Sequence, residues 1–177
     1  MTEVSPSRPD DFRVVVDAQI ALAMFLVRRD RPTEVPMKRL LLRLLPRPTF
    51  SWLWTPDILL DYERGASAIE QDQRLMRKAV FDRSGFRLLL SALQLYPAVS
   101  VSITTLRAVR ERMGQSSRTR ERDLDDAIYL ACAIDGEAQV LTSEDSSLLS
   151  LGSPYEGIRI VTWAELFVDL QDRGFVS

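Results

Sequence analysis

Short apolar runs alternate along the chain with longer segments of helical patterning. Residues 13–17 form a β-branched run that is typical of a strand buried on both faces. Four further segments have apolar or alternating patterning. The predicted strands are therefore residues 13–17, 50–54, 98–103, 139–142 and 157–161. The predicted helices cover residues 18–29, 36–45, 56–65, 68–81, 85–95, 106–113, 123–135, 144–151 and 163–170. Helices interleaved with short apolar strands predict a three-layer α/β/α protein, with a central parallel sheet covered by helices on both faces.

Several of the predicted helix ends carry capping residues. Thr55 and Pro56 predict a helix start, since threonine caps free N–H groups and proline is tolerated at the first helical position. Gly136 predicts the end of the helix over residues 123–135, and Thr162 predicts the cap of the last helix.

The 177-residue length suits one domain with a substantial core. Residues 1–12 are polar and contain prolines, which predicts a flexible lead-in, and residues 13–177 are expected to form a single domain. The apolar run at residues 20–27 is far shorter than the roughly 20 residues that a membrane span needs. We therefore expect a soluble, cytoplasmic protein with no membrane partner.

Composition narrows the possible chemistry. The formal net charge is −2, which argues against a protein that coats nucleic acid through bulk charge. A single cysteine, Cys132, allows no intramolecular disulfide, and its apolar surroundings indicate a buried thiol in a reducing compartment. The chain has no histidine, which excludes histidine-dependent triads, the common zinc sites and histidine acid–base catalysis. Carboxylates, Lys and Arg, hydroxyls or a hard metal ion must carry any reaction.

Acidic side chains fall where predicted strands end or neighbouring helices begin, and one more, Asp61, lies inside the helix after Thr55 and Pro56, from which it could point inward. Functional groups gather at the carboxyl ends of strands in such folds. The acids at these positions are Asp17, Asp61, Asp125, Asp126, Glu144 and Asp145. Carboxylates that are brought together repel one another, and a divalent cation removes this cost. All-oxygen ligands select Mg²⁺ or Mn²⁺, which can activate water for phosphodiester hydrolysis without a histidine.

Each acid also has a structural explanation. Glu144 or Asp145 could cap a helix, the acids at 125–126 could complement a helix dipole, and Asp61 could be a solvated helix residue. Asp17 closes a wholly apolar strand and is the least easily explained by structure alone. Residue spacing by itself thus leaves a possible metal site.

Arginines crowd the region just before Asp126. They are Arg107, Arg110, Arg112, Arg118, Arg120 and Arg122. Such a cluster beside an acidic pocket could hold a phosphate backbone, and the alternative is a solvated segment of mixed charge, given Glu111 and Glu121 among the arginines. Trp52 and Trp54 could stack on bases, but their alternation along a strand favours core packing.

Five segments in order are similar to motifs of one known family, the PIN domains. They are residues 13–21 (a buried strand ending in an acid), 55–62 (Thr-Pro-Asp-Ile-Leu-Leu-Asp-Tyr), 126–133 (Asp-Ala-Ile-Tyr-Leu-Ala-Cys-Ala), 139–144 (Gln-Val-Leu-Thr-Ser-Glu) and 157–162 (Gly-Ile-Arg-Ile-Val-Thr). The resemblance implies parallel strands between helices and an acidic pocket that holds Mg²⁺ or Mn²⁺ for cleavage of single-stranded RNA. By matching motifs, the acids would be Asp17, Asp61, Asp126 and Glu144, with Asp145 as the alternative fourth acid.

The resemblance also implies partners. Many PIN proteins are the toxin halves of bacterial toxin–antitoxin pairs, which dimerise and are silenced by a small antitoxin. Residues 18–19 are Ala-Gln where the family usually has Thr/Ser-Asn, and Asp61 and Glu144 differ by one methylene from the usual acids. The alternative to an active ribonuclease is therefore a PIN-like module that has lost catalysis and binds RNA or a protein partner.

Overall fold

The computed structural model describes residues 11–114 and 126–176. In chain order its elements are β1 (Phe12–Val16), α1 (Ala18–Ala23), β2 (Leu26–Arg28), the 3-10 helix η1 (Met37–Arg39), α2 (Leu40–Leu44), β3 (Phe50–Leu53), α3 (Pro56–Gln71), α4 (Gln73–Lys78), β4 (Ala79–Phe81), α5 (Arg83–Leu93), α6 (Ile103–Gly114), α7 (Ala127–Asp135), β5 (Val140–Thr142), α8 (Ser146–Leu149), β6 (Arg159–Val161) and α9 (Trp163–Asp172). Among the described residues, no helix is long and apolar enough to cross a membrane.

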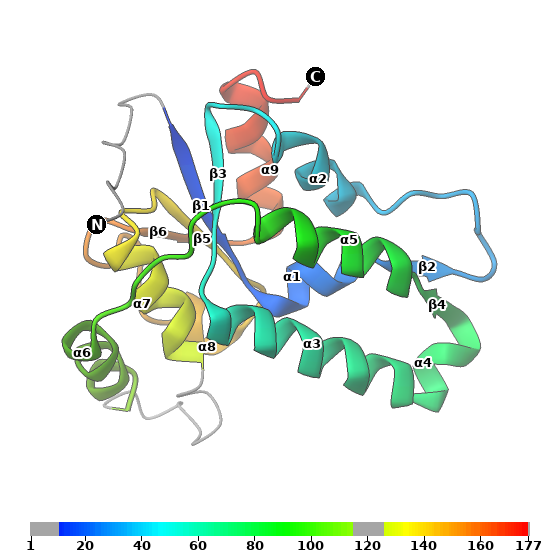
Figure 1. Cartoon of the computed structure of the whole chain (residues 1–177), viewed down its shortest axis with the longest axis horizontal. Coiled ribbons are helices and arrows are strands. Elements are labelled where there is room, and N and C mark those ends of the chain that lie inside the picture. The colour runs from blue at the N-terminus through cyan, green and yellow to red at the C-terminus, as the bar shows by residue number, and fades with distance from the viewer. Residues whose placement is uncertain (1–10, 115–125, 177) are drawn as a thin grey trace.

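Four parallel strands form the central sheet in the order β3-β1-β5-β6. Val14 of β1 lies opposite Trp52 on one side and Val140 on the other. Figure 1 views this sheet nearly edge-on, with α6 and α7 on one side and α1 and α2 on the other. The predicted three-layer α/β/α fold with a parallel sheet is confirmed.

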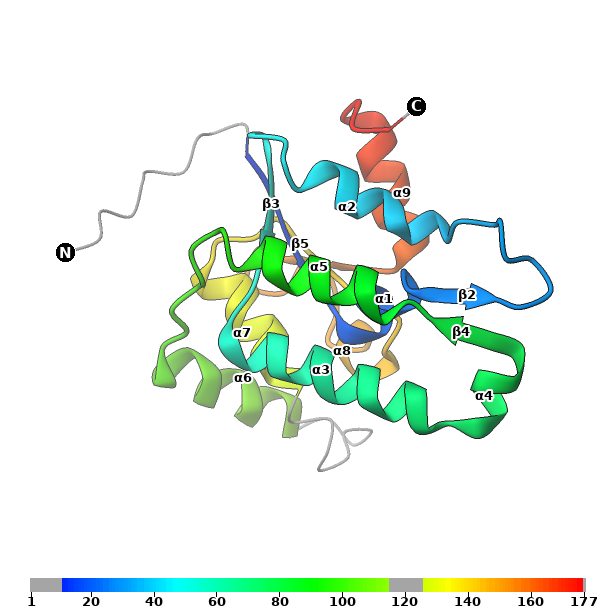
Figure 2. The same cartoon turned by 45° about the vertical axis from the view of Figure 1, so that its right-hand side comes forward.

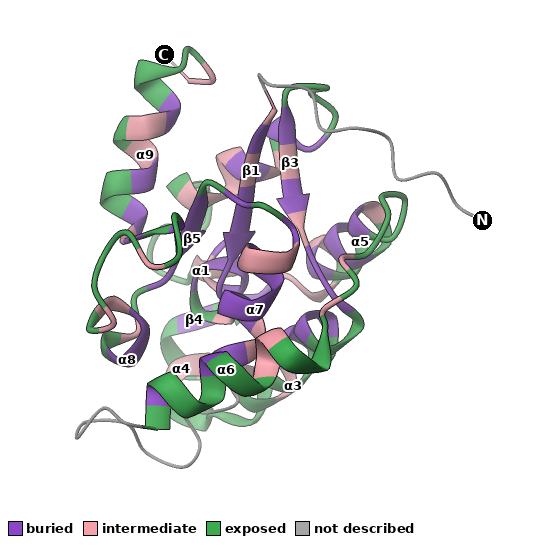
Figure 3. Cartoon of the chain, turned by 90° about the vertical axis from the view of Figure 1, so that its left-hand side faces the viewer, coloured by how far each residue is buried: buried purple, intermediate pink, exposed green. Residues whose placement is uncertain are grey.

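The centre of the core explains the continuous apolar runs in the sequence. Val14, Val15 and Val16 are completely buried, because helices cover both faces of β1. Helix α7 packs against β1 and β5 and is covered outside by α6, so its side chains are buried almost all round (Figure 3). Cys132 lies in this helix, and burial raises the pKa of its thiol to about 12, as expected for an inert apolar cysteine.

A second, two-stranded antiparallel sheet pairs β2 with β4. Figure 2 shows this ribbon at the end of the molecule that lies away from the main sheet. The predictions of helix through residues 26–29 and 79–81 are therefore wrong. Tertiary pairing overrides helical composition there, with hydrogen bonds from Arg29 N to Lys78 O at 2.9 Å and from Asp82 N to Phe25 O at 2.8 Å.

Residues 98–103 are not a strand, contrary to the prediction. The Val99 N–H bonds the Trp54 carbonyl at 2.8 Å just beyond β3, and the chain then turns into α6. Asp135 accepts a hydrogen bond from Ser102 N at 2.6 Å and so ties this connection to the end of α7. The β-branched residues of this segment therefore form one backbone hydrogen bond next to β3 and then the start of α6, instead of a strand.

Helix α3 extends to Gln71, beyond the predicted end at residue 65. Gly65 lies inside this helix and does not end it. Its role is close packing of α3 against α1, since a Cβ at this position would lie 2.5 Å from Leu22 Cδ1. The predicted caps are present, with Thr55 accepting from Ile58 N, Gly136 ending α7 and Thr162 forming a capping box. Trp52 and Trp54 are buried, which confirms their packing role.

Candidate active site

Asp17 sits at the point where the central strand β1 ends and α1 begins. Its carboxylate caps α1 by accepting a hydrogen bond from Gln19 N at 3.4 Å, and the side chain is only 5% exposed. Ser143, at the end of the neighbouring strand β5, donates its hydroxyl to Asp17 Oδ2. The backbone of Asp17 is also fixed, through its N–H bonded to Thr142 O at 3.0 Å. The carboxylate is thus held rigidly at the carboxyl edge of the sheet.

The surroundings of Asp17 disfavour its negative charge. Burial raises the pKa of its carboxyl group above the ordinary 3.8, the hydrogen bonds from Ser143 and Gln19 lower it, and the charges of Asp145 and Asp61 raise it further. No Lys or Arg of the described residues forms an ion pair with it. A buried carboxylate that faces other carboxylates and lacks a cationic partner is suited to bind a cation.

Two tyrosines position the acids on this edge. The Tyr129 hydroxyl of α7 donates to Asp61 Oδ2 at 2.5 Å, and the Tyr62 hydroxyl of α3 donates to the carbonyl of Val16, next to Asp17. Their rings stack with centroids 6.4 Å apart. Burial raises the pKa of both phenols, so both remain protonated donors at neutral pH. Tyr129 therefore orients one oxygen of Asp61 and leaves the other available.

Glu144 and Asp145 follow β5 but have different neighbours. Glu144 is exposed, and its Oε1 accepts from the N–H of Trp163 at 3.1 Å, at the start of α9. Asp145 caps α8 through Ser147 N at 2.6 Å, and its own N–H donates to the Ser143 hydroxyl at 2.9 Å. Both acids thus take helix-end roles, and Asp145 is the one whose charge acts on Asp17.

Asp126 stands at the N-cap position of α7, with helical backbone angles and no side-chain capping bond to the helix. It is half-buried. It lies three residues before Tyr129, and residues so spaced share one face of a helix. Since Tyr129 reaches Asp61, this places Asp126 on the face of α7 that is turned to the other acids.

The arginines predicted to bind RNA are only partly described. Arg110 lies exposed on α6, the helix that covers α7, and Arg112 on the same helix lies over the ring of Tyr155. Arg118, Arg120 and Arg122 lie outside the described residues, as does Asp125. Their predicted contact with RNA therefore stays a prediction.

The acids fit a hard divalent cation in donor chemistry. Asp17, Asp61 and Asp145 offer only oxygen atoms, which favour Mg²⁺ or Mn²⁺ over softer metals. Within residues 11–114 and 126–176, however, no three such side chains converge closely enough to ligate one ion together. An ion bound to one or two of these carboxylates would keep water molecules in its remaining positions, as Mg²⁺ commonly does in proteins.

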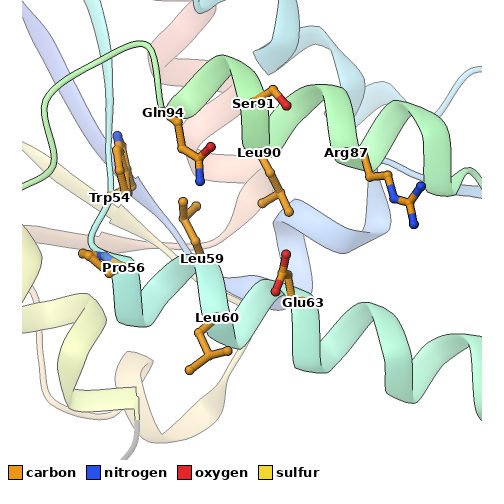
Figure 4. A pocket seen from close by; sticks show the side chains of 9 residues that line it. All are labelled: Trp54, Pro56, Leu59, Leu60, Glu63, Arg87, Leu90, Ser91 and Gln94. Atoms are coloured by element: carbon orange, nitrogen blue, oxygen red, sulfur yellow. The ribbon is translucent and has the colours of Figure 1, made fainter.

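A surface hollow lies elsewhere, between α3 and α5. It measures about 580 Å³, and Figure 4 shows Leu59 and Leu90 directed into it, with Glu63 and Arg87 on the two facing helices. None of the predicted acids lines it. Its apolar floor has no group that suits phosphodiester chemistry, so we keep the acids at the sheet edge as the candidate site.

Sequence reasoning missed the two hydroxyl donors, Ser143 and Tyr129. Residue 18 is Ala where the family usually has a hydroxyl, and Ser143 supplies one to Asp17 from the neighbouring strand. Its position directly after a predicted strand was a usable signal. Tyr129 carried no such signal, because a tyrosine in an apolar helix is equally typical of a core residue.

Removing the charge of Asp17 is expected to stabilise the protein when no divalent ion is present. Because the native pKa lies above 3.8, the folded state binds the proton more tightly than the unfolded chain, and ionised Asp17 costs stability at pH 7. This cost disappears as the pH falls through the raised pKa towards 3.8. Urea unfolding in chelator should show Asp17→Asn to be more stable than wild type at pH 7, with the difference shrinking on acidification.

Asp57→Asn is the control for that measurement, because Asp57 is an exposed carboxylate in the first turn of α3. Loss of its favourable helix-dipole interaction should slightly lower stability. An Asp17→Asn variant that is less stable than wild type at pH 7 would contradict the conclusion that burial destabilises the ionised carboxylate of Asp17.

Comparison with known families agrees with this geometry. A family model described as a PIN domain matches residues 13–147, which include all of β1 but its first residue, the elements α3, α7 and β5, and every acid considered above. No curated protein matches the chain at a significant level. The family match spans well over half of the sequence, and the chain belongs to the PIN domain family.

Proposed function

We propose that this protein is a metal-dependent ribonuclease of the PIN type that hydrolyses phosphodiester bonds of single-stranded RNA. The observation that carries the proposal is Asp17, a carboxylate buried at the carboxyl end of the central strand. It faces the charges of Asp61 and Asp145 and has no cationic partner among the described residues. PIN domains are generally nucleases and typically use divalent metals, which fits this arrangement.

In this proposal Asp17, Asp61 and Asp126 hold the Mg²⁺ or Mn²⁺ ion. Asp145 is the better-supported fourth acid, because Glu144 is engaged with the Trp163 N–H. When bound, the ion supplies Lewis-acid stabilisation of the phosphate charge and lowers the pKa of water. Ser143 orients the Asp17 carboxylate by hydrogen bonding, and Tyr129 does the same for Asp61.

The biological role that the family resemblance supports is the toxin half of a toxin–antitoxin pair. We accordingly propose a homodimer that a small antitoxin protein silences. Arg110, together with Arg118, Arg120 and Arg122, would hold the RNA backbone through its phosphates.

A second function is supported by a specific observation. The acids do not converge as a ready-made triad within the described residues, and Ala18 removes a hydroxyl from the usual position. A PIN-like module that binds RNA or a protein without cleaving RNA would have this appearance.

The deciding experiment is cleavage of a mixed set of single-stranded RNAs in Mg²⁺, in Mn²⁺ and in chelator. A ribonuclease should cut in one or both metals and not in chelator, because the carboxylates alone cannot activate water. Well-folded protein that cuts no RNA in either metal would refute the nuclease and leave the binding module.

A further inference from the structure

A basic hollow lies at the far end of α3 from the acids. It measures about 480 Å³ and is formed by the β2–β4 ribbon together with α4. Its charged lining residues are Arg28, Arg29, Asp30, Arg77 and Lys78, and its remaining lining is apolar. Four cations against one carboxylate stand out in a chain whose net charge is −2.

The fold holds these cations on regular structure. Arg29 is tied to α4 by two bonds, from its N–H to Lys78 O at 2.9 Å and from its Nε to Met76 O at 3.0 Å. Arg28 is paired with Asp30 through two hydrogen bonds of 3.0 and 2.7 Å. The lone acid is therefore already neutralised by one of the arginines, and the remaining positive charge belongs to the other three cations.

Arg77 and Lys78 are the most available of these cations. Both are exposed in the last turn of α4, and neither forms an ion pair with another described residue. Arg29 lines the same hollow, so the three cations present several N–H donors to it. An extended anion with more than one phosphate suits such a group of donors.

Helix α3 links this hollow to the acids. From Asp61 to Gln71 the helix advances about 15 Å, at roughly 1.5 Å per residue, and α4 follows at once. Figures 1 and 2 show α3 running from the carboxyl end of the sheet to α4 and the ribbon. Arg64 lies exposed one turn beyond Asp61 on this path. Asp61 and Arg64 thus follow one another along α3, and the end of this helix leads through α4 into the basic hollow.

We propose that the basic hollow binds the phosphodiester backbone of single-stranded RNA, several nucleotides away from the phosphate at the acids. The proposal rests on the proposed ribonuclease function, since α3 connects the hollow to that site. Single-strand binding surfaces combine a basic track with contact over several nucleotides, at sites of roughly 4–16 nucleotides. The hollow would anchor the strand and leave its chemistry to the acids.

The test compares two double variants that remove the same charge. Arg77→Ala/Lys78→Ala removes two positive charges from the lining of the hollow. Arg43→Ala/Arg47→Ala removes two exposed arginines in and just after α2. Binding of a fluorescent single-stranded RNA of about twelve nucleotides is measured in chelator at several salt concentrations. We expect the first variant to bind about 10-fold more weakly, with a salt slope smaller by about 1.4, from roughly 0.7 per lost phosphate contact. The second variant should bind like wild type.

Cleavage separates this proposal from the proposed function. In Mg²⁺ or Mn²⁺ the hollow variant should show a raised KM for the long RNA and unchanged cleavage of a dinucleotide, because its single phosphodiester must lie at the acids and leaves none for the hollow. A wild type that binds RNA in this way but cuts none would refute the nuclease and retain the hollow. Equal binding of RNA by the two double variants, or no RNA binding by wild type, would each overturn the hollow as an RNA site.

Discussion

Asp17→Asn should lower the rate of metal-dependent RNA cleavage by more than about 100-fold. Loss of a residue that only supports a metal ligand typically costs roughly 10–100-fold in affinity or activity, and a ligand itself should cost more. Asn keeps the size of the side chain and can still accept the Ser143 hydrogen bond, so the fold is retained while the charge is lost. The measurement is initial cleavage rate at saturating Mg²⁺ and Mn²⁺, beside unfolding curves that establish the fold.

The two acids after β5 provide the matched comparison for this prediction. Asp145→Asn should lower cleavage because the Asp145 charge acts on Asp17, whereas Glu144→Gln should leave it nearly unchanged, because Glu144 bonds the Trp163 N–H and is exposed. The opposite ranking would assign the fourth position to Glu144, as the family motif implies. Full activity of Asp17→Asn would contradict the site itself.

The main sheet was predictable because its signals are local. Val14, Val15 and Val16 form a β-branched run that is typical of a doubly covered strand, and the acid directly after it marks the strand end. Parallel strands bring their carboxyl ends to one edge, so the approach of Asp17 to Asp145 follows from topology. The motif order then predicted the family that the comparison shows.

The supporting contacts were not predictable, because they join residues far apart in the sequence. Ser143 and Asp17 are 126 positions apart, and Tyr129 and Asp61 are 68 apart. Ser143 carries a local signal in its position directly after a predicted strand, but that signal does not identify its partner, and nothing around Tyr129 distinguishes a donor to a carboxylate from a core residue. Such pairings are visible only when the strands and helices are placed in space.

The β2–β4 ribbon was missed for a related reason. Its strands have three residues each, too few for a periodic signal, and they continue segments of helical composition. A two-stranded ribbon is also marginal alone and needs packing against other elements. Three aromatic rings supply that packing: Phe86 of α5 lies 5.7 Å from Phe25 and 5.6 Å from Phe81, measured between ring centroids. The ribbon therefore depends on tertiary contacts that its own sequence does not reveal.

Phe86→Ala should accordingly destabilise the protein by about 3–5 kcal/mol, since the Phe86 ring is completely buried and its removal leaves a cavity between α5 and the ribbon. At roughly 2–4 °C per kcal/mol for a chain of this size, the thermal midpoint should fall by about 6–20 °C. Leu88→Ala on the same helix is the control: Leu88 is 71% exposed, and its loss should change stability by no more than about 0.5 kcal/mol. Equal, small effects of the two substitutions would show that the aromatic cluster does not hold the ribbon. A large loss of stability in Phe86→Ala alone would support the view that packing against α5 holds the β2–β4 ribbon. The basic hollow, which this ribbon helps to form, would then depend on that packing as well.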